Sequence, residues 1–324
     1  MNEKKLTIVI PTYNRKKQLS EQLKRFAEYE IHKYASVFIL DNCSDYDVES
    51  AIPKTIAKDV FLKKNSINVG LSANILRAFE FTDSGWLWIL SDDDFAVENS
   101  IVKIFGLIES LKDVDKQCVA LKYDSDLYGH FKNVDISNSN DLIQSENNYK
   151  YFSSLLLLST WVFNVSFYKK IVSRAYSFLI TYSPHLVLVI MCLDDSNKNY
   201  VRMSSEYIVE KDKREGLWDP AIVFPYLVHG YSIMPSSLSN ESVLCLRSYC
   251  WQGSIKDVFF MYARMKYNGF SERVIKSLLY GERWYRSYLY LFSRLFMLFL
   301  NVVPERFKNR LFRHNKKSIW CERL

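Results

Sequence analysis

Short apolar stretches alternate with amphipathic helical stretches over the first 110 residues of this 324-residue chain. Apolar residues recur every three or four positions at 15–29, 71–81 and 101–111, which predicts three helices. The stretches between them are predicted strands, at 6–10, 37–40, 60–62 and 86–90. Strands that are apolar on both faces must be covered on both sides. This order therefore predicts an α/β fold with a doubly wound, mostly parallel sheet and helices on both faces.

A polar cluster follows each of the four predicted strands. In a parallel sheet, ligands bind beyond the carboxyl ends of the strands, so four such clusters should line one crevice. Their coincidence is harder to explain by chance than any one of them. The clusters are 11–15 (Pro-Thr-Tyr-Asn-Arg), 41–45 (Asp-Asn-Cys-Ser-Asp), 65–70 and 91–94 (Ser-Asp-Asp-Asp).

Three consecutive carboxylates, Asp92, Asp93 and Asp94, follow the apolar stretch 86–90. Neighbouring carboxylates at the end of a buried strand repel one another and lose hydration, so a divalent cation would stabilise them. Oxygen ligands at this spacing suit Mg²⁺ or Mn²⁺, which commonly bridge to a diphosphate. Taken alone, the run could equally be a solvated acidic turn that caps the next helix.

Together, these segments resemble the nucleotide-binding half of family 2 glycosyltransferases with the GT-A fold. The particular form is similar to bacterial transferases that build O-antigen or capsule repeats, the abequosyltransferase-like group among them. The matching segments are Ile8–Arg15, Leu40–Asp45, Asn68–Asn74 and Ser91–Asp94. The resemblance implies a hexosyl- or deoxyhexosyltransferase that moves a sugar from a nucleoside diphosphate sugar to a hydroxyl group.

The resemblance also implies site residues. Asp41 would accept a hydrogen bond from the base, and Gly70 would allow the backbone to approach the nucleotide closely. Arg77 could face a phosphate, although a solvated helix arginine is the alternative. The implied nucleotide-sugar-binding set is Pro11, Thr12, Tyr13, Asn14, Arg15, Asp41, Asn42, Asn68, Gly70, Asn74, Arg77, Asp92 and Asp93.

In the same way, Asp92 and Asp94 match the first and last carboxylates of the family's Asp-x-Asp metal motif. Asp94 would bind the metal, while Asp92 or Asp93 would also hydrogen-bond the ribose or the donor sugar. The ion would stabilise negative charge on the departing nucleoside diphosphate.

The chain departs from the family at the general base. Inverting members usually carry a Glu-Asp pair at the start of a later helix, and the corresponding stretch here is 182–188, without an acidic residue. Pro184 suits a first helical turn, and His185 stands at the expected position. We therefore predict His185, with Asp94, as a catalytic residue that serves as base or binds the acceptor. The alternative is a structural histidine, and the configuration of the product stays open.

Two tryptophans are candidate acceptor contacts, because an aromatic face can stack on a sugar. Trp161 lies on a predicted strand at 159–164, where it could equally be an ordinary core residue, and Trp218 lies in a polar loop. His229 is a weaker candidate for a metal or phosphate ligand, and a loop histidine without a special role is the alternative.

The net charge of +7 lies entirely in residues 282–324, which hold ten basic and three acidic residues. The stretch 283–303 is rich in Leu, Phe and Tyr, but it is short for a membrane span and Arg294 interrupts it. With the basic residues that follow, 283–317 predicts a helix that lies on an anionic membrane surface. The alternative is a helix packed on the catalytic domain or across a homo-oligomer. A nucleic-acid partner is not expected, because the aromatic residues form one apolar group.

The segment before Pro11 is too short for a signal peptide, and the six cysteines show no zinc-binding spacing. Both features favour a cytoplasmic protein with reduced thiols. Together with the basic tail, they predict a peripheral protein at the inner face of the cell membrane.

Three parts are therefore predicted: a nucleotide-sugar-binding half at 1–110, an acceptor-binding half at 111–240, and a helical, basic extension at 241–324. The predicted function is metal-assisted glycosyl transfer to a surface polysaccharide, on a glycan or lipid-linked glycan acceptor. A sugar nucleotidyltransferase is one alternative, although 11–14 is a poor phosphate-binding loop. A non-catalytic nucleotide-sugar- or glycan-binding module is another, since the Glu-Asp pair is missing.

Overall fold

The computed structural model describes residues 5–82, 85–111, 116–125, 131–145, 149–211, 227, 230–231, 234, 238–249, 295 and 298. Two compact units divide the chain: residues 1–212 with 235–237, and residues 213–234 with 238–324. The strands below all belong to the first unit, and helix α11 (Asn240–Tyr249) belongs to the second. The predicted boundaries at 110 and 240 stay predictions.

Several sequence predictions fall outside the described residues. They are Trp218, His229 and, apart from Leu295 and Leu298, the stretch 283–317. Where the structure does describe the chain, it contains no helix that is both long enough and apolar enough to cross a bilayer.

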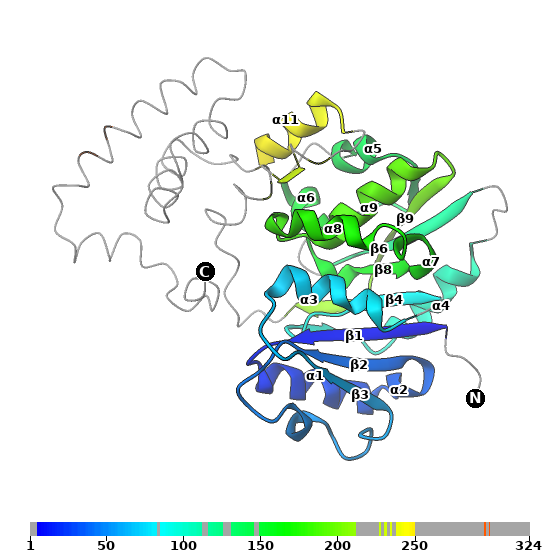
Figure 1. Ribbon diagram of the computed structural model, residues 1–324. Coiled ribbons are helices and arrows are strands. Elements are labelled where there is room, and N and C mark those ends of the chain that lie inside the picture. The colour runs from blue at the N-terminus through cyan, green and yellow to red at the C-terminus, as the bar shows by residue number, and fades with distance from the viewer. Residues whose placement is uncertain are drawn as a thin grey trace. The chain divides into compact units, whose positions relative to one another are not determined.

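Eight described strands form one mixed sheet in the order β3-β2-β1-β4-β8-β6-β9-β7 (Figure 1). The first four pair in parallel, and β6 also pairs in parallel with β9; only β8 and β7 run antiparallel to their neighbours. This confirms the predicted α/β fold with a mostly parallel sheet. The strands are β1 (Leu6–Thr12), β2 (Ser36–Asp41), β3 (Val60–Lys64), β4 (Trp86–Ile89), β6 (Gln117–Asp124), β7 (Val134–Ile136), β8 (Trp161–Asn164) and β9 (Asn199–Tyr207). A separate two-stranded ladder joins β5 (Asp94–Ala96) to β10 (Val209–Lys211).

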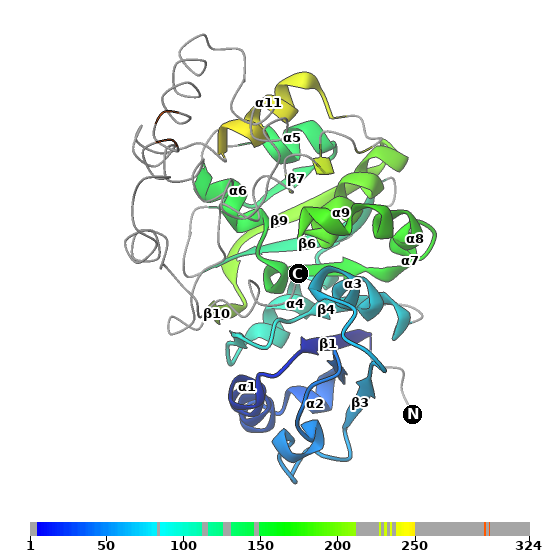
Figure 2. The ribbon, with the colours of Figure 1, turned by 60° about the vertical axis from the view of Figure 1, so that its left-hand side comes forward.

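Helices cover both faces of the sheet. As a result, β1 and β4 are buried along their whole length. On one face, α1 (Lys16–Glu28), α2 (Ile31–Tyr34) and α4 (Ser100–Glu109) share a core with alternate residues of β1 and β2. On the other, α3 (Leu71–Arg77) packs against α9 (Pro184–Asp195). Figures 1 and 2 show α3 and α9 across the sheet from α1. The remaining α-helices described in this unit are α5 (Ser139–Gln144), α6 (Tyr149–Leu155), α7 (Val165–Tyr168) and α8 (Val172–Ala175).

The predicted elements of the first 110 residues are all present, with small shifts at their ends. The helix predicted at 71–81 ends at Arg77 and continues as a 3₁₀ turn over Ala78–Glu80. Strands β6 and β9 carry no prediction, because a buried lysine (Lys122) and an arginine (Arg202) interrupt their apolar residues. The helix predicted at Pro184 does begin there, with proline in its first turn.

The four predicted polar clusters meet at one edge of the sheet. Strands β1 to β4 are parallel, so their carboxyl ends lie together, and Thr12 pairs in register with Asp41, which pairs with Lys64. Strand β8 runs the opposite way and therefore begins at this edge with Trp161, opposite Lys122 near the end of β6. We call the ends of β1 to β4, with the loops that follow them, the donor edge.

Candidate active site

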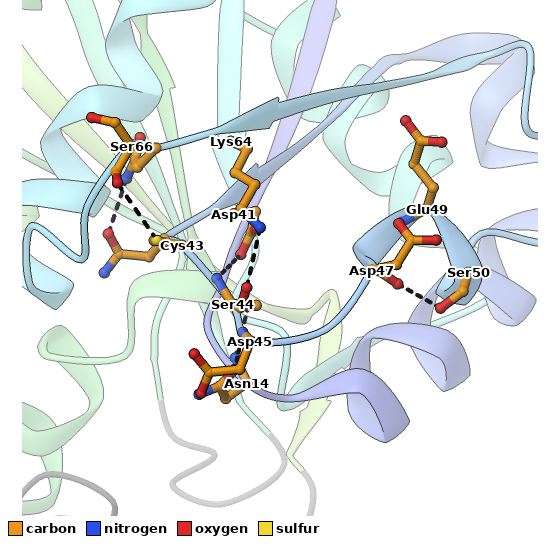
Figure 3. A network of polar contacts seen from close by, with 12 residues as sticks. Asn14, Asp41, Cys43, Ser44, Asp45, Asp47, Glu49, Ser50, Lys64 and Ser66 are labelled. Carbon is orange, nitrogen blue, oxygen red and sulfur yellow. Dashed lines mark hydrogen bonds and ion pairs between the residues drawn. The ribbon is translucent and has the colours of Figure 1, made fainter.

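The loops after β1 and β2 are joined at the donor edge by Asn14 (Figure 3). Its side chain donates to Asp45 Oδ2 at 2.8 Å and accepts from the Asp45 backbone N–H at 2.8 Å. Its backbone N–H donates to Ser44 Oγ at 2.9 Å. Asn14 adopts a left-handed conformation with φ of 54°, which asparagine tolerates better than most residues. The structure thus uses the side chain to hold two loops together, and its nucleotide contact stays a prediction.

Asp41, at the end of β2, is fully buried, and one of its two carboxylate oxygens has no hydrogen-bond partner among the described residues. Its Oδ1 accepts from the backbone N–H of Ser44 at 2.9 Å. Its Oδ2 lies 3.8 Å from the ammonium of Lys64 and has no hydrogen-bond partner among the residues that the structure describes (Figure 3). A buried carboxylate oxygen without a donor is costly unless a ligand or water supplies one. The contact to a base that the resemblance implies stays a prediction.

Four asparagines hold the loop between β3 and α3 in place. Asn65 donates to Asn42 Oδ1 at 2.9 Å and to Asn74 Oδ1 at 2.8 Å. Asn42 in turn donates to Asn68 Oδ1 at 2.7 Å, and Asn74 donates to the carbonyl oxygen of Leu40 at 3.2 Å. The predicted site residues Asn42, Asn68 and Asn74 are therefore brought together. Their side chains bond to one another, which makes them supports of this loop.

Gly70 and Arg77 stand at the two ends of α3. Gly70 precedes the helix with φ of 81° and ψ of 160°, a conformation essentially confined to glycine. A Cβ atom there would meet nothing within 4 Å, so the backbone conformation, and not crowding, requires glycine. Arg77 donates to Asn65 Oδ1 and lies 3.4 Å from Glu80. Its guanidinium thus contacts protein groups, and its phosphate contact stays a prediction.

The three carboxylates after β4 have different surroundings. Asp92 is 5% exposed, and its Oδ2 accepts from Thr12 Oγ1 at 2.7 Å. Asp93 is paired with Arg15, whose Nη1 lies 2.8 Å from Asp93 Oδ2 and 3.8 Å from Asp92 Oδ1. Asp94 is 6% exposed and begins β5. Arg15 therefore offsets part of the negative charge that the sequence concentrates here.

Asp92 and Asp94 suit a divalent cation by their chemistry. Carboxylate oxygens are preferred ligands of Mg²⁺ and Mn²⁺, and Mg²⁺ usually takes one or two protein carboxylates together with phosphate oxygens and water. Within the described ranges, no group of three His, Cys, Asp or Glu side chains could hold a metal ion. Asp92 and Asp94 therefore suit an ion whose remaining ligands would be oxygens of a bound diphosphate and water.

A buried lysine lies one strand beyond β8. Lys122 is fully buried, and its Nζ donates to Thr160 Oγ1 at 2.7 Å and to the carbonyl oxygen of Tyr123 at 2.6 Å, with Ser154 Oγ at 3.3 Å. Burial lowers the pKa of Lys122 well below its usual value, although the charge of Asp124 opposes this. We call Lys122, Ser154 and Thr160 the Lys122 cluster. All three of its polar side chains have partners.

His185 lies next to this cluster in the first turn of α9. It is 1% exposed, and its Nε2 lies 3.4 Å from the carbonyl oxygen of Leu155, to which it can donate. Burial lowers the pKa of His185 to about 3, against the effect of the Leu155 carbonyl, and the charge of Lys122 adds to the lowering. The imidazole is therefore neutral at pH 7 and a weak base. Its Nδ1 has no hydrogen-bond partner in the described part of the chain.

The predicted acceptor contact Trp161 is fully buried. Its indole N–H donates to the carbonyl oxygen of Leu155 at 2.9 Å, and its ring stacks on Phe163 with centroids 6.3 Å apart. The ammonium of Lys122 lies 5.6 Å from the ring centroid. In this structure the ring has no free face for a sugar, so a role in acceptor binding stays a prediction.

The family of the chain follows from its sequence match. Residues 7–177, more than half of the chain, match the model of glycosyl transferase family 2. The chain belongs to this family. The segments that carried the resemblance lie within the matched residues.

Individual relatives agree with this assignment. Abequosyltransferase RfbV of Salmonella typhimurium is 26% identical over 113 residues, which is 34% of this chain and 34% of that protein. Residues 1–349 of TarS from S. aureus, in complex with UDP-GlcNAc, share 15% identity at a TM-score of 0.51, covering 93% of this chain and 82% of that one. The mannosyltransferase PcManGT from Pyrobaculum calidifontis, in complex with GDP-Man and Mn²⁺, shares 12% identity at a TM-score of 0.50, covering 92% and 88%. At these identities, the two structures show a shared GT-A fold.

Tyr46 is a donor-edge residue that the sequence did not reveal. It follows the cluster 41–45, and its ring packs against the core. Burial raises the pKa of Tyr46 to about 12; the charges of Asp92 and Asp41 add to this, and a side-chain hydrogen bond with Thr12 acts against it. The available signal was a single aromatic residue in a polar loop, which spacing alone does not assign to a site.

Ser159 is a second residue without a sequence signal. Its Oγ accepts from the backbone N–H of Ser91 at 2.8 Å, directly before the three carboxylates. Its carbonyl oxygen accepts from the indole N–H of Trp88 at 2.8 Å. The start of β8 is thereby bonded to the carboxylate loop, which fixes where that loop begins.

Proposed function

We propose that this glycosyltransferase moves a sugar from a nucleoside diphosphate sugar to a hydroxyl group of a glycan acceptor, with Mg²⁺ or Mn²⁺. The observation that carries the proposal is the donor edge itself. There Thr12, Asp41 and Asp92 lie at the ends of three neighbouring strands, and Asp41 presents a buried, open acceptor atom. TarS with UDP-GlcNAc and PcManGT with GDP-Man and Mn²⁺ support it as proteins of the same fold.

Donor binding divides into base recognition and charge compensation. Asp41 Oδ2 would accept from the base, in a loop shaped by Pro11, Thr12 and Tyr13. Arg15 already lies 2.8 Å from Asp93, so a positive charge stands at the place where a diphosphate and its metal would meet the carboxylates. A guanidinium there can offset charge on either the carboxylates or a phosphate.

Asp92 and Asp94 would hold the ion, and the bound ion would stabilise charge on the departing diphosphate. Thr12 orients Asp92 through the 2.7 Å hydrogen bond to its Oδ2. Asp94 takes its direction from β5, where it pairs in register with Lys211 of β10. The hydrogen bond from Thr12 and the pairing of β5 with β10 thus hold these two residues in place.

On the acceptor side, His185 is the proposed acceptor-binding group. Its neutral imidazole with an open Nδ1 supports accepting a hydrogen bond from a hydroxyl group. The low pKa disfavours complete proton uptake, so the base role finds less support than the binding role. The proposed acceptor is a surface polysaccharide or its lipid-linked precursor at the inner face of the cell membrane, in keeping with the basic stretch 283–317.

A ligand panel tests the proposal. The full chain would be heated with UDP-, CDP-, dTDP- and GDP-sugars, each with Mg²⁺, Mn²⁺ or EDTA. A ligand at one hundred times its Kd stabilises the folded state by about 2.7 kcal/mol, so one member should raise the Tm only with metal. If no nucleotide sugar raised the Tm with either metal, the proposal would fail. Binding without any turnover or hydrolysis would favour the non-catalytic module, which the absence of an acidic residue at 182–188 permits.

A further inference from the structure

The buried ammonium of Lys122 joins three segments of the chain. Its Nζ donates to the carbonyl oxygen of Tyr123 on β6, to Ser154 in α6 and to Thr160 in the 3₁₀ turn Leu158–Thr160. Burying an ammonium costs free energy, and an apolar residue of similar volume often serves stability as well or better. Stability alone therefore does not explain why a lysine stands here.

The 3₁₀ turn that Lys122 holds is also bonded to the carboxylate loop. Thr160 Oγ1 accepts from the ammonium at 2.7 Å and donates to the carbonyl oxygen of Leu157, the residue before the turn, at 2.7 Å. Between these two residues lies Ser159, whose Oγ accepts from the backbone N–H of Ser91 at 2.8 Å. The same short turn thus contacts the buried lysine on one side and the carboxylate loop on the other.

Ser91 connects this contact to the carboxylates themselves. Its hydroxyl donates to Asp93 Oδ1 at 2.5 Å, and its carbonyl oxygen accepts from the backbone N–H of Asp94 at 3.3 Å. Ser159 and Thr160 are consecutive and fully buried, so neither can shift without moving the other. A continuous series of hydrogen bonds therefore leads from the buried ammonium, through one turn, to two of the three carboxylates.

We propose that Lys122 is a positioning residue of the donor site. Through the turn 158–160 it holds the carboxylate loop 91–94 where Asp94 can bind the metal ion of the donor. The inference rests on the proposed function and deepens it, because it gives a residue of β6 a role in donor binding. Residues that hold metal ligands through hydrogen bonds typically change metal affinity or activity by about tenfold to one hundredfold.

Lys122→Met removes the ammonium and keeps an unbranched side chain that packs well in cores. The full-length protein would first be titrated calorimetrically with UDP, CDP, dTDP and GDP in the presence of Mn²⁺. With the preferred nucleotide at saturation, Mn²⁺ would then be titrated into the wild type and the variant. We expect the apparent Kd for Mn²⁺ to rise about tenfold, because the metal ligands lose their position. The Tm of the ligand-free protein would be measured alongside.

Thr160→Val is the second variant, and it leaves the charge of the site unchanged. It removes only the hydroxyl to which the ammonium bonds, so the apparent Kd for Mn²⁺ should again rise. The double variant with Lys122→Met should show no further rise, because both changes act along one path. If Lys122→Met does not fold, Thr160→Val decides alone.

Thr181→Val is the matched control. Thr181 is also fully buried in a 3₁₀ turn and donates to the carbonyl oxygen three residues earlier, that of Phe178, at 2.8 Å. Its turn leads into α9 instead of β8. The apparent Kd for Mn²⁺ should therefore equal that of the wild type.

The outcomes distinguish this inference from the proposed function. If the wild type binds none of the four nucleotides in a Mn²⁺-dependent way, both fail. If it does, and both Lys122→Met and Thr160→Val keep its affinity for Mn²⁺, only the inference fails. A weaker affinity in Lys122→Met alone would assign the effect to charge and overturn the positioning role. Equal losses in Thr160→Val and Thr181→Val would mean a general loosening of the fold, which overturns it as well.

Discussion

The donor edge and the Lys122 cluster are both buried, polar and built at the same edge of one sheet, yet they differ in how their polar atoms are satisfied. The three side chains of the Lys122 cluster find partners within the protein. Among the described residues, the donor edge leaves Asp41 Oδ2 without a hydrogen-bond partner. Buried polarity alone therefore does not mark a ligand site. Incomplete hydrogen bonding of a buried polar atom is the more specific sign.

His185 stands between these two cases. It adjoins the satisfied cluster, but within the described residues its Nδ1 lacks a hydrogen-bond partner, like Asp41 Oδ2. A neutral imidazole nitrogen costs less to bury unpaired than a carboxylate oxygen does. The comparison therefore predicts the stronger functional effect at the donor edge, and an effect on both acceptor binding and stability at His185. Four substitutions test this comparison, and they follow in order of decreasing expected effect.

The largest effect is expected for Asp94→Asn. The change keeps the shape of the side chain and removes its charge, so turnover should fall by about one hundredfold or more, the usual loss when a charge-stabilising group is removed. The folded state should persist, as measured by circular dichroism and Tm. Asp59→Asn is the control, because Asp59 is exposed in the turn before β3. Equal turnover in both variants would contradict a metal role for Asp94.

Asn65→Ala should loosen the loop between β3 and α3. Asn65 contacts Asn42, Asn74 and Arg77, and its loss would leave Asn74 Oδ1 without this donor. We expect the free energy of unfolding to fall by about 2 kcal/mol, as for buried polar groups left unpaired. Urea denaturation would measure it. Unchanged stability would show that the asparagine network does not hold the loop.

His185→Gln should change how stability depends on pH. The pKa of His185 is about 3 in the folded state, against about 6.5 when unfolded. The unfolded chain then binds the extra proton between these values, so the histidine lowers the stability of the wild type as pH falls below 6.5. At pH 5 the loss is about 2 kcal/mol, and it is absent near pH 8.

The glutamine variant should lack this loss, which urea denaturation at pH 5 and pH 8 would detect. A parallel pH dependence in both proteins would contradict the buried, neutral imidazole. The same variant also tests function, since near-normal turnover would remove His185 from the mechanism.

The smallest effect is expected for Lys64→Met. The ammonium lies 3.8 Å from Asp41 Oδ2, but its side chain is 52% exposed, so water screens the pair. The free energy of unfolding should change by about 0.5 kcal/mol or less. A change of several kcal/mol, measured by denaturation, would mean that Lys64 satisfies Asp41 and that Asp41 is not an open acceptor.

Much of the fold could be predicted from the sequence, because apolar runs and their spacing carry that information. Strands β1 to β4, the helices between them and the edge where their polar clusters meet all follow from these patterns. In the second half, strands β6 and β9 were missed for a physical reason. Lys122 and Arg202 lie on strands, where their charges mask the apolar pattern, although Lys122 is buried.

Partners within the site could not be predicted. Spacing places Asn14, Asn74 and Arg77 near one edge, but it cannot show that they bond to Asp45, Asn65 and Glu80 respectively. The burial of His185 was also hidden, because a helix that is apolar on all sides gives no sign of which residues contact water. Tyr46 was missed for the opposite reason, since one aromatic residue in a polar loop has no periodicity.

The bond between Ser91 and Ser159 has a consequence for engineering. It ties the carboxylate loop to a residue almost seventy positions away in the chain, in the 3₁₀ turn directly before β8. Acceptor preference in such enzymes is an attractive target for chimeras that exchange the second half between relatives. A graft that replaces Ser159 with a residue lacking a hydroxyl would misplace the catalytic loop of the host, even with every host carboxylate intact. Swaps should therefore start after this serine and keep the host hydroxyl.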